Sequence, residues 1–269
     1  MIQNQKSNHI NSKHKNSKKD FVFKYGSIYN EDFESGSKHL KRQNVEVELV
    51  IAEPQLRNSK SSFSKKSNLA SAPWVTSAAS LLKKGGSFLC ICSPEQVDSV
   101  LSAAKKARLQ YKDILIFENL SPLVDKNVID KTVNDKKAEN RRSSSGRNQK
   151  KFFTSSASII LWFIKPGEKV YFNKSGLSYV SPVIKSSYDV DFDKYDERIS
   201  FFQKPIKLYE RLLKLFTKIN DTVLYLNANS GSGIIAALIL KRNYLAFEKN
   251  VKVYENTRGR IEKFKHSNS

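Results

Sequence analysis

The residues with the clearest chemical potential follow a short apolar strand near the C-terminus. The run Asp221–Gly233 is apolar at first and then small and polar, and an apolar helical pattern, Ile234–Leu240, follows it. A strand, a tight turn and a helix N-terminus in this order let a ligand approach the backbone closely. The next strand, Tyr244–Phe247, ends on one acid, Glu248, which is what a nucleoside ribose needs from an α/β sheet.

Strands and helices that alternate along the chain must position this turn and this acid. The apolar run Val47–Ile51 predicts a further buried strand. Helical patterns are found at Ala72–Leu82, Pro94–Ala107, Ile206–Phe216 and Gly233–Leu240. The alternation predicts an α/β fold with a mainly parallel sheet and helices on both faces.

Laid end to end, the C-terminal segments resemble bacterial DNA amino-methyltransferases of the β class. That family typically reads Q-K-P, a helix, V-L-D-P-F-A-G-S-G-T, a helix, and a strand ending in Glu before Y-Y-E-x-A-x-x-R-I. Here Gln203–Pro205 opens the amphipathic helix, the turn before Gly233 follows, and Val253–Glu255 with Arg260 and Ile261 match the last piece. The ordered set is far more specific than a lone Ser-Gly-Ser-Gly turn.

The resemblance extends over nearly the whole chain from residue 21. Its further matching segments are the opening strand at Ser27–Asp32, the helix end, glycine turn and strand at Leu81–Cys92, the strand Tyr111–Phe117, and a last hairpin from Ile159–Phe163 through Tyr171–Asn173. The catalytic loop precedes the cofactor turn, which is the β-class permutation. The resemblance therefore implies a circularly permuted, Rossmann-like fold that uses S-adenosylmethionine to methylate adenine N6, ahead of cytosine N4.

The resemblance places the catalytic tetrapeptide at Glu53, Pro54, Gln55 and Leu56, where the family has D-P-P-Y. In the family the Asp and the prolyl carbonyl bind the amine hydrogens of a flipped-out base, and the Tyr stacks on it. Glu53 keeps the charge but adds a methylene, and Leu56 cannot stack. Trp74 is either a substitute aromatic or a core residue.

The resemblance also implies a set of cofactor-binding residues. These are Asp32, Gln203, Lys204, Pro205, Asn227, Ser230, Gly231 and Glu248. Tyr225 replaces the family's acid, Asn227 its aromatic residue, and Asn229 the first glycine of the turn, although Asn tolerates left-handed backbone angles. A fourth departure is Ser155–Ser158, where the family often has His-Glu.

These departures leave several functions open. One is an active DNA adenine-N6 or cytosine-N4 methyltransferase, solitary or paired with a restriction enzyme. Another is a catalytically inactive relative that binds DNA or serves as a partner subunit. The altered tetrapeptide favours the inactive relative, whereas the retained Gln203–Pro205 and Glu248 favour the enzyme. An RNA substrate and a decayed gene product stay open as well.

Charge indicates a polyanionic partner. The 269 residues carry a formal net charge of +21, which favours nucleic acid ahead of a membrane, with a Lys-rich proteome as the alternative. Basic loops at 57–68 and 122–151 flank the expected site and predict phosphate contacts. The candidate DNA-binding residues are Arg141, Arg142, Arg147, Lys150 and Lys151, and a solvated loop is the alternative.

Composition also bears on domains and compartment. Residues 1–20 predict a disordered basic tail, and 21–265 one methyltransferase-like domain into which both loops are inserted. No apolar run approaches the ~20 residues that span a bilayer, and we expect a cytoplasmic protein, nucleoid-associated if bacterial, with a second subunit or a homodimer as a further option. Cys90 and Cys92 are expected on opposite faces of one strand, as buried small hydrophobes without a disulfide or metal.

Overall fold

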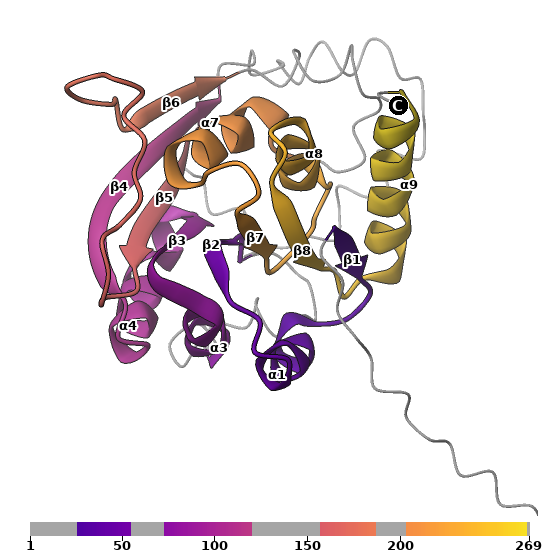
Figure 1. Cartoon of the computed structure of the whole chain (residues 1–269), viewed down its shortest axis with the longest axis horizontal. Coiled ribbons are helices and arrows are strands. Elements are labelled where there is room, and N and C mark those ends of the chain that lie inside the picture. The colour runs from indigo at the N-terminus through magenta and orange to yellow at the C-terminus, as the bar shows by residue number, and fades with distance from the viewer. Residues whose placement is uncertain (1–25, 55–72, 120–156, 187–202, 268–269) are drawn as a thin grey trace, which may run out of the picture.

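One mixed sheet organises the computed structural model, which describes residues 26–54, 73–119, 157–186 and 203–267. Its strand order is β1-β8-β7-β2-β3-β5-β4-β6 (Figure 1). The strands are β1 Ser27–Tyr29, β2 Val47–Ala52, β3 Leu82–Cys92, β4 Gln110–Asn119, β5 Ala157–Ile164, β6 Val183–Ser186, β7 Thr222–Tyr225 and β8 Asn243–Phe247. Only the pairs that involve β5 are antiparallel. The predicted mainly parallel sheet is thus confirmed.

Helices cover both faces of the sheet. They are α1 Phe33–Arg42, α3 Pro73–Leu81, α4 Val97–Lys106, α7 Ile206–Phe216, α8 Ser232–Ile239 and α9 Val251–Ser267. Figure 1 shows α1, α3 and α4 below the sheet and α7 and α8 above it. Successive strand residues point to opposite faces, so Val50 packs into the core on the α1 side and Leu49 and Ile51 into the core on the α7 side.

The helix predictions hold closely, with one division. α7 spans the predicted residues, whereas the predicted helix Pro94–Ala107 starts as a separate 3₁₀ turn, η1 Pro94–Gln96, before α4.

The predicted last hairpin is wrong. Residues 165–182 contain no strand, and β6 pairs in parallel with β4 rather than with β5. Aromatic contacts order part of this segment instead, because Phe172 packs against Trp162 and Phe216.

The prediction that the two cysteines lie on opposite faces is wrong, whereas their predicted burial is confirmed. Cys90 and Cys92 lie two residues apart on β3 and therefore share a face, and both enter the core on the α1 side. Both are buried free thiols, as expected for small hydrophobes. Burial raises the pKa of Cys90, and a hydrogen bond from Cys90 lowers that of Cys92.

Several predicted segments lie outside the described residues. These are the tail 1–20 and both basic loops, 57–68 and 122–151, so the predicted domain boundaries remain a prediction. Among the helices that the structure describes, none combines the length and the apolar character needed to cross a bilayer.

The strand order creates a topological switch point near the centre of the sheet. From β7 the chain passes through α8 to β8 on one side, and from β2 it passes through α3 to β3 on the other. The chain thus leaves the neighbours β7 and β2 toward opposite edges of the sheet. In open α/β sheets such a switch point is where ligands bind.

Two helical glycines provide a test of the packing. A Cβ on Gly36 in α1 would lie 2.1 Å from Cε1 of the buried Phe247, whereas one on Gly259 in α9 would meet nothing within 4 Å. We predict that Gly36→Ala lowers the free energy of unfolding by about 1–3 kcal/mol through overpacking. The control Gly259→Ala should raise it by up to about 1 kcal/mol through helix propensity. Urea unfolding measures both, and equal midpoints would contradict the packing of α1 on β8.

Candidate functional site

The candidate site lies where β2 and β7 end. Leu226 N donates to Ile51 O at 3.1 Å, which extends the pairing of the two strands to their carboxyl ends. Glu53 follows β2, and the turn Asn227–Gly231 follows β7. Asn229 Nδ2 donates to Glu53 Oε2 at 3.4 Å and so links the turn directly to the acid. The structure thus brings together the candidate catalytic acid and the candidate cofactor turn.

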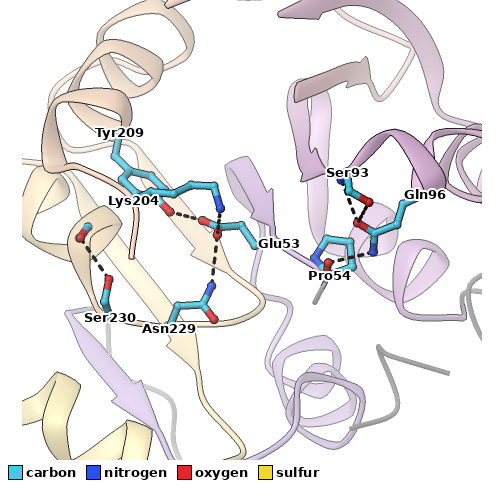
Figure 2. Close-up of polar contacts among 9 residues, drawn as sticks. Glu53, Pro54, Ser93, Gln96, Lys204, Tyr209, Asn229 and Ser230 are labelled. Carbon is cyan, nitrogen blue, oxygen red and sulfur yellow. Dashed lines mark hydrogen bonds and ion pairs between the residues drawn. The ribbon is translucent and has the colours of Figure 1, made fainter. Parts of the chain in front are cut away.

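Glu53 is the centre of a polar cluster (Figure 2). Lys204 Nζ lies 3.1 Å from Oε2, and the hydroxyl of Tyr209 donates to Oε1. The side chains of Glu53 and Lys204 are only 11% and 16% exposed. Lys204 immediately precedes Pro205, the N-cap residue of α7, and Tyr209 lies one turn into that helix. The start of α7 therefore holds the carboxylate in place.

The neighbouring peptide group is held from the other side. Gln96 Nε2 donates to Pro54 O at 2.9 Å, and Gln96 is buried. Its Oε1 accepts from Ser93 N at 3.0 Å and from Ser93 Oγ at 3.3 Å. Figure 2 shows this bridge on the side of Pro54 that faces away from the Glu53 cluster. Glu53 and Pro54 are thus fixed by different elements.

The turn after β7 depends on left-handed backbone at two positions. Asn229 has φ 50° and Gly231 has φ 78°. A Cβ on Gly231 would lie 2.9 Å from Cγ2 of Thr257 in α9, so a glycine is needed there for space as well as for conformation. The turn can therefore form without the family's first glycine.

Helix α9 supports the turn from behind. Arg260 Nη1 donates to Ser230 O at 2.8 Å and to Ser232 Oγ at 3.0 Å. Thr257 Oγ1 donates to Asn229 O. These contacts satisfy carbonyl groups of the turn.

Glu248, at the end of β8, also organises the turn. Its carboxylate accepts from Asn229 N at 3.2 Å and from Asn250 N at 2.9 Å. The side chain is buried, and this burial raises its pKa although the backbone hydrogen bonds lower it. Two oxygens with about four acceptor sites retain capacity for further donors such as ribose hydroxyls.

Other predicted residues have different environments. Asp32 caps α1, where its carboxylate accepts from Ser35 N at 3.1 Å and from Ser35 Oγ at 3.0 Å. Gln203 is buried at 2% exposure. The remaining candidates, Gln55, Leu56, Arg141, Arg142, Arg147, Lys150 and Lys151, lie outside the described residues.

Tyr225, which stands where the family has an acid, belongs to the core. Its hydroxyl donates to Gly233 O at 2.7 Å, and burial raises its pKa above the ordinary value, so it supplies no negative charge. Its ring lies 2.5 Å from the position of a Cβ on Gly233. Trp74 is 2% exposed and stacks on Phe88, so it is a core residue and not a substitute base-stacking aromatic.

Sequence reasoning missed two residues of this site, Tyr209 and Gln96. Tyr209 lies on an amphipathic helix, one turn after Lys204, and that spacing is the only signal that places it near Glu53. Gln96 lies 42 positions from Pro54 in the sequence and belongs to a neighbouring strand connection. The sequence contains no local signal for this contact.

Known proteins resemble this chain in sequence pattern and in fold. A family model described as DNA methylase (N6_N4_Mtase) matches residues 29–258. The structure of the M1.HpyAVI–SAM complex has a TM-score of 0.65 and 22% identity over 87% of this chain and 98% of that one. PvuII DNA methyltransferase (cytosine-N4-specific) has a TM-score of 0.61 and 17% identity over 92% of each chain.

A third structure, TTHA0409 from Thermus thermophilus complexed with S-adenosyl-L-methionine, has a TM-score of 0.57. Its identity is 16%, over 88% of this chain and 93% of that one. No curated protein matches the sequence. At these identities the solved structures establish the Rossmann-like methyltransferase fold, as the sequence predicts.

The left-handed conformation of Asn229 can be tested with two substitutions. Both Asn229→Gly and Asn229→Ala remove the contact with Glu53, but only Ala opposes φ 50°. We predict that the Ala variant is less stable than the Gly variant by about 1 kcal/mol, the cost of a left-handed Cβ. Urea unfolding gives the difference, and an Ala variant as stable as the Gly variant would exclude the left-handed turn.

Proposed function

Since the chain belongs to the DNA methylase family, we propose that it is an S-adenosylmethionine-dependent DNA amino-methyltransferase. Its target is an exocyclic amine, adenine N6 ahead of cytosine N4, because Glu53 keeps the carboxylate of the tetrapeptide that the sequence resembles. The observation that carries this proposal is the contact of 3.4 Å between Asn229 Nδ2 and Glu53 Oε2. It places the candidate cofactor turn next to the candidate amine acceptor.

The residues around the turn fit S-adenosylmethionine. Asn227 Oδ1 is buried and has no hydrogen-bond partner among the described residues, and a bound group would satisfy such an atom. Glu248 would bind the ribose, and the backbone of Ser230 and Gly231 at the start of α8 would approach the cofactor closely. Asp32 would bind its adenine end. When bound, the cofactor supplies the methyl group.

Glu53 would act on the target amine. Its carboxylate accepts a hydrogen bond from the amine N–H, which orients the nitrogen lone pair, and it takes the proton that the nitrogen releases. Lys204 and Tyr209 hold the carboxylate on both oxygens, so the geometry is set before the base enters. Gln96 fixes the adjoining Pro54 carbonyl in the same way.

A second candidate function is a catalytically inactive relative that binds DNA or serves as a partner subunit. One observation favours it. Tyr225 buries a neutral hydroxyl where the family has an acid. Such a protein would keep the scaffold and the charge without methyl transfer.

Titration calorimetry with S-adenosylmethionine, followed by radiolabelled methyl transfer to mixed-sequence DNA, separates the two candidates. Binding with transfer supports the enzyme. Binding without transfer, or no binding at all, supports the inactive relative.

For the enzyme, the role of Glu53 is tested by Glu53→Gln. We predict that methyl transfer falls by about 10²–10⁴-fold, because the amide cannot take the amine proton. Cofactor affinity should change little. The control is Glu262→Gln, which removes an exposed carboxylate 3.4 Å from Arg258 on α9, and it should leave transfer unchanged. An active Glu53→Gln enzyme would show that another loop carries the chemistry.

We also propose that Arg141, Arg142 and Arg147 contact DNA phosphates. Replacing all three with Ala should weaken binding and reduce the slope of log affinity against log salt by about 0.9 per lost contact. The matched control replaces Lys83, Lys84 and Lys218, three exposed cations at or near the amino ends of β3 and β7, opposite the site. Fluorescence anisotropy at several salt concentrations measures both variants. An equal effect of the two triple substitutions would leave only non-specific attraction by net charge.

A further inference from the structure

The position of Lys204 differs from the one that the sequence indicates. The resemblance assigns it to the cofactor, yet among the described residues its ammonium has one polar partner, Glu53, at 3.1 Å. No hydrogen bond links it to the turn Asn227–Gly231 in that part of the chain. The ammonium therefore lies directly beside the candidate amine acceptor, and it reaches the turn only through the Glu53 oxygen that it shares with Asn229 Nδ2.

Among the residues that the structure describes, Lys204 has an acceptor for only one of its donors. An ammonium group carries three N–H donors, and the carboxylate of Glu53 engages one of them. The Lys204 side chain is 16% exposed, so water has limited access to its remaining two N–H donors. Partly buried donors of a charged group are stabilised when a ligand supplies an acceptor.

Glu53 and Lys204 together present an acceptor beside a donor. Each exocyclic amine that this family methylates has the complementary pair, a donor beside an acceptor. In adenine the N6 amine adjoins the unprotonated N1, and in cytosine the N4 amine adjoins N3. If the amine donates to Glu53, the neighbouring ring nitrogen falls on the side of the ammonium.

We propose that Lys204 is a base-binding residue that donates a hydrogen bond to the ring nitrogen next to the target amine. The inference rests on the proposed methyltransferase function and adds a specificity-determining contact to it. Tyr209 holds the other oxygen of Glu53 and Asn229 Nδ2 donates to Oε2, so the carboxylate keeps two of its three donors when Lys204 is replaced.

The test is a double-mutant cycle between the protein and the base. Lys204→Met keeps the length of the side chain and removes the donor. The base is changed from adenine to 1-deazaadenine, which has C–H in place of N1, at the mapped target position of a duplex; 3-deazacytosine serves if the target is cytosine. Lys207→Met is the control, because Lys207 lies three positions further on, in the first turn of α7, is 55% exposed and pairs with Glu210.

Two quantities are measured for each protein and duplex. They are equilibrium binding without cofactor and single-turnover methyl transfer. For each protein we compare the ratio of its values with adenine and with 1-deazaadenine. This ratio should be about tenfold larger for wild type and Lys207→Met than for Lys204→Met, which corresponds to one hydrogen bond to a charged donor. Weaker pairing of 1-deazaadenine within the duplex affects all proteins equally and cancels in the cycle.

The outcomes separate this inference from the function on which it rests. Equal discrimination by wild type and Lys204→Met, with transfer intact, overturns the role of Lys204 alone. Weaker S-adenosylmethionine binding by Lys204→Met with unchanged discrimination assigns the ammonium to the cofactor and also overturns it. If wild type neither binds the cofactor nor transfers methyl to any DNA, the proposed function itself fails, and the inference fails with it.

Discussion

A largely buried carboxylate after the end of a central strand is the constraint on which the site depends. Desolvation of Glu53 would be costly without a counter-charge and hydrogen bonds. Its three donors come from segments 151 to 176 positions away in the sequence: Lys204 and Tyr209 at the start of α7, and Asn229 in the turn after β7. The requirement to satisfy one acid therefore ties β2, α7 and the turn into a single arrangement.

The turn is stabilised in a comparable way. Glu248 accepts from the backbone of Asn229, and α9 contributes Thr257 and Arg260 from the opposite side. Side chains rather than glycines thus stabilise much of the turn. This explains how Asn229 can stand where the family has the first glycine of the turn. The left-handed backbone costs only about 1–2 kcal/mol, and several hydrogen bonds stabilise this conformation.

Periodic segments were the part of the fold that sequence could predict. The helix Ile206–Phe216 and the strand Tyr244–Phe247 have unambiguous apolar patterns, and each lies within a residue of its predicted bounds. The segment 165–182 was mispredicted because tertiary contacts of Phe172, not strand pairing, order part of it. In the site, Glu53 was predictable from the sequence because it follows the end of a strand. Tyr209 and Gln96 were not, because their contacts depend on which strand connections are neighbours in the sheet.

The ion pair of Glu53 and Lys204 points to function, because such a pair contributes little to the stability of a fold. Burying two charges costs several kcal/mol of desolvation, and apolar residues of similar volume often serve a fold as well or better. The packing around the pair is otherwise conventional, with Tyr209 against Tyr225 on the same face of the sheet. A fold that needed only its core would not require this pair at the switch point, where ligands bind in open α/β sheets. Its position there, joined to the turn through Asn229, is accounted for by a ligand that needs both an acceptor and a donor.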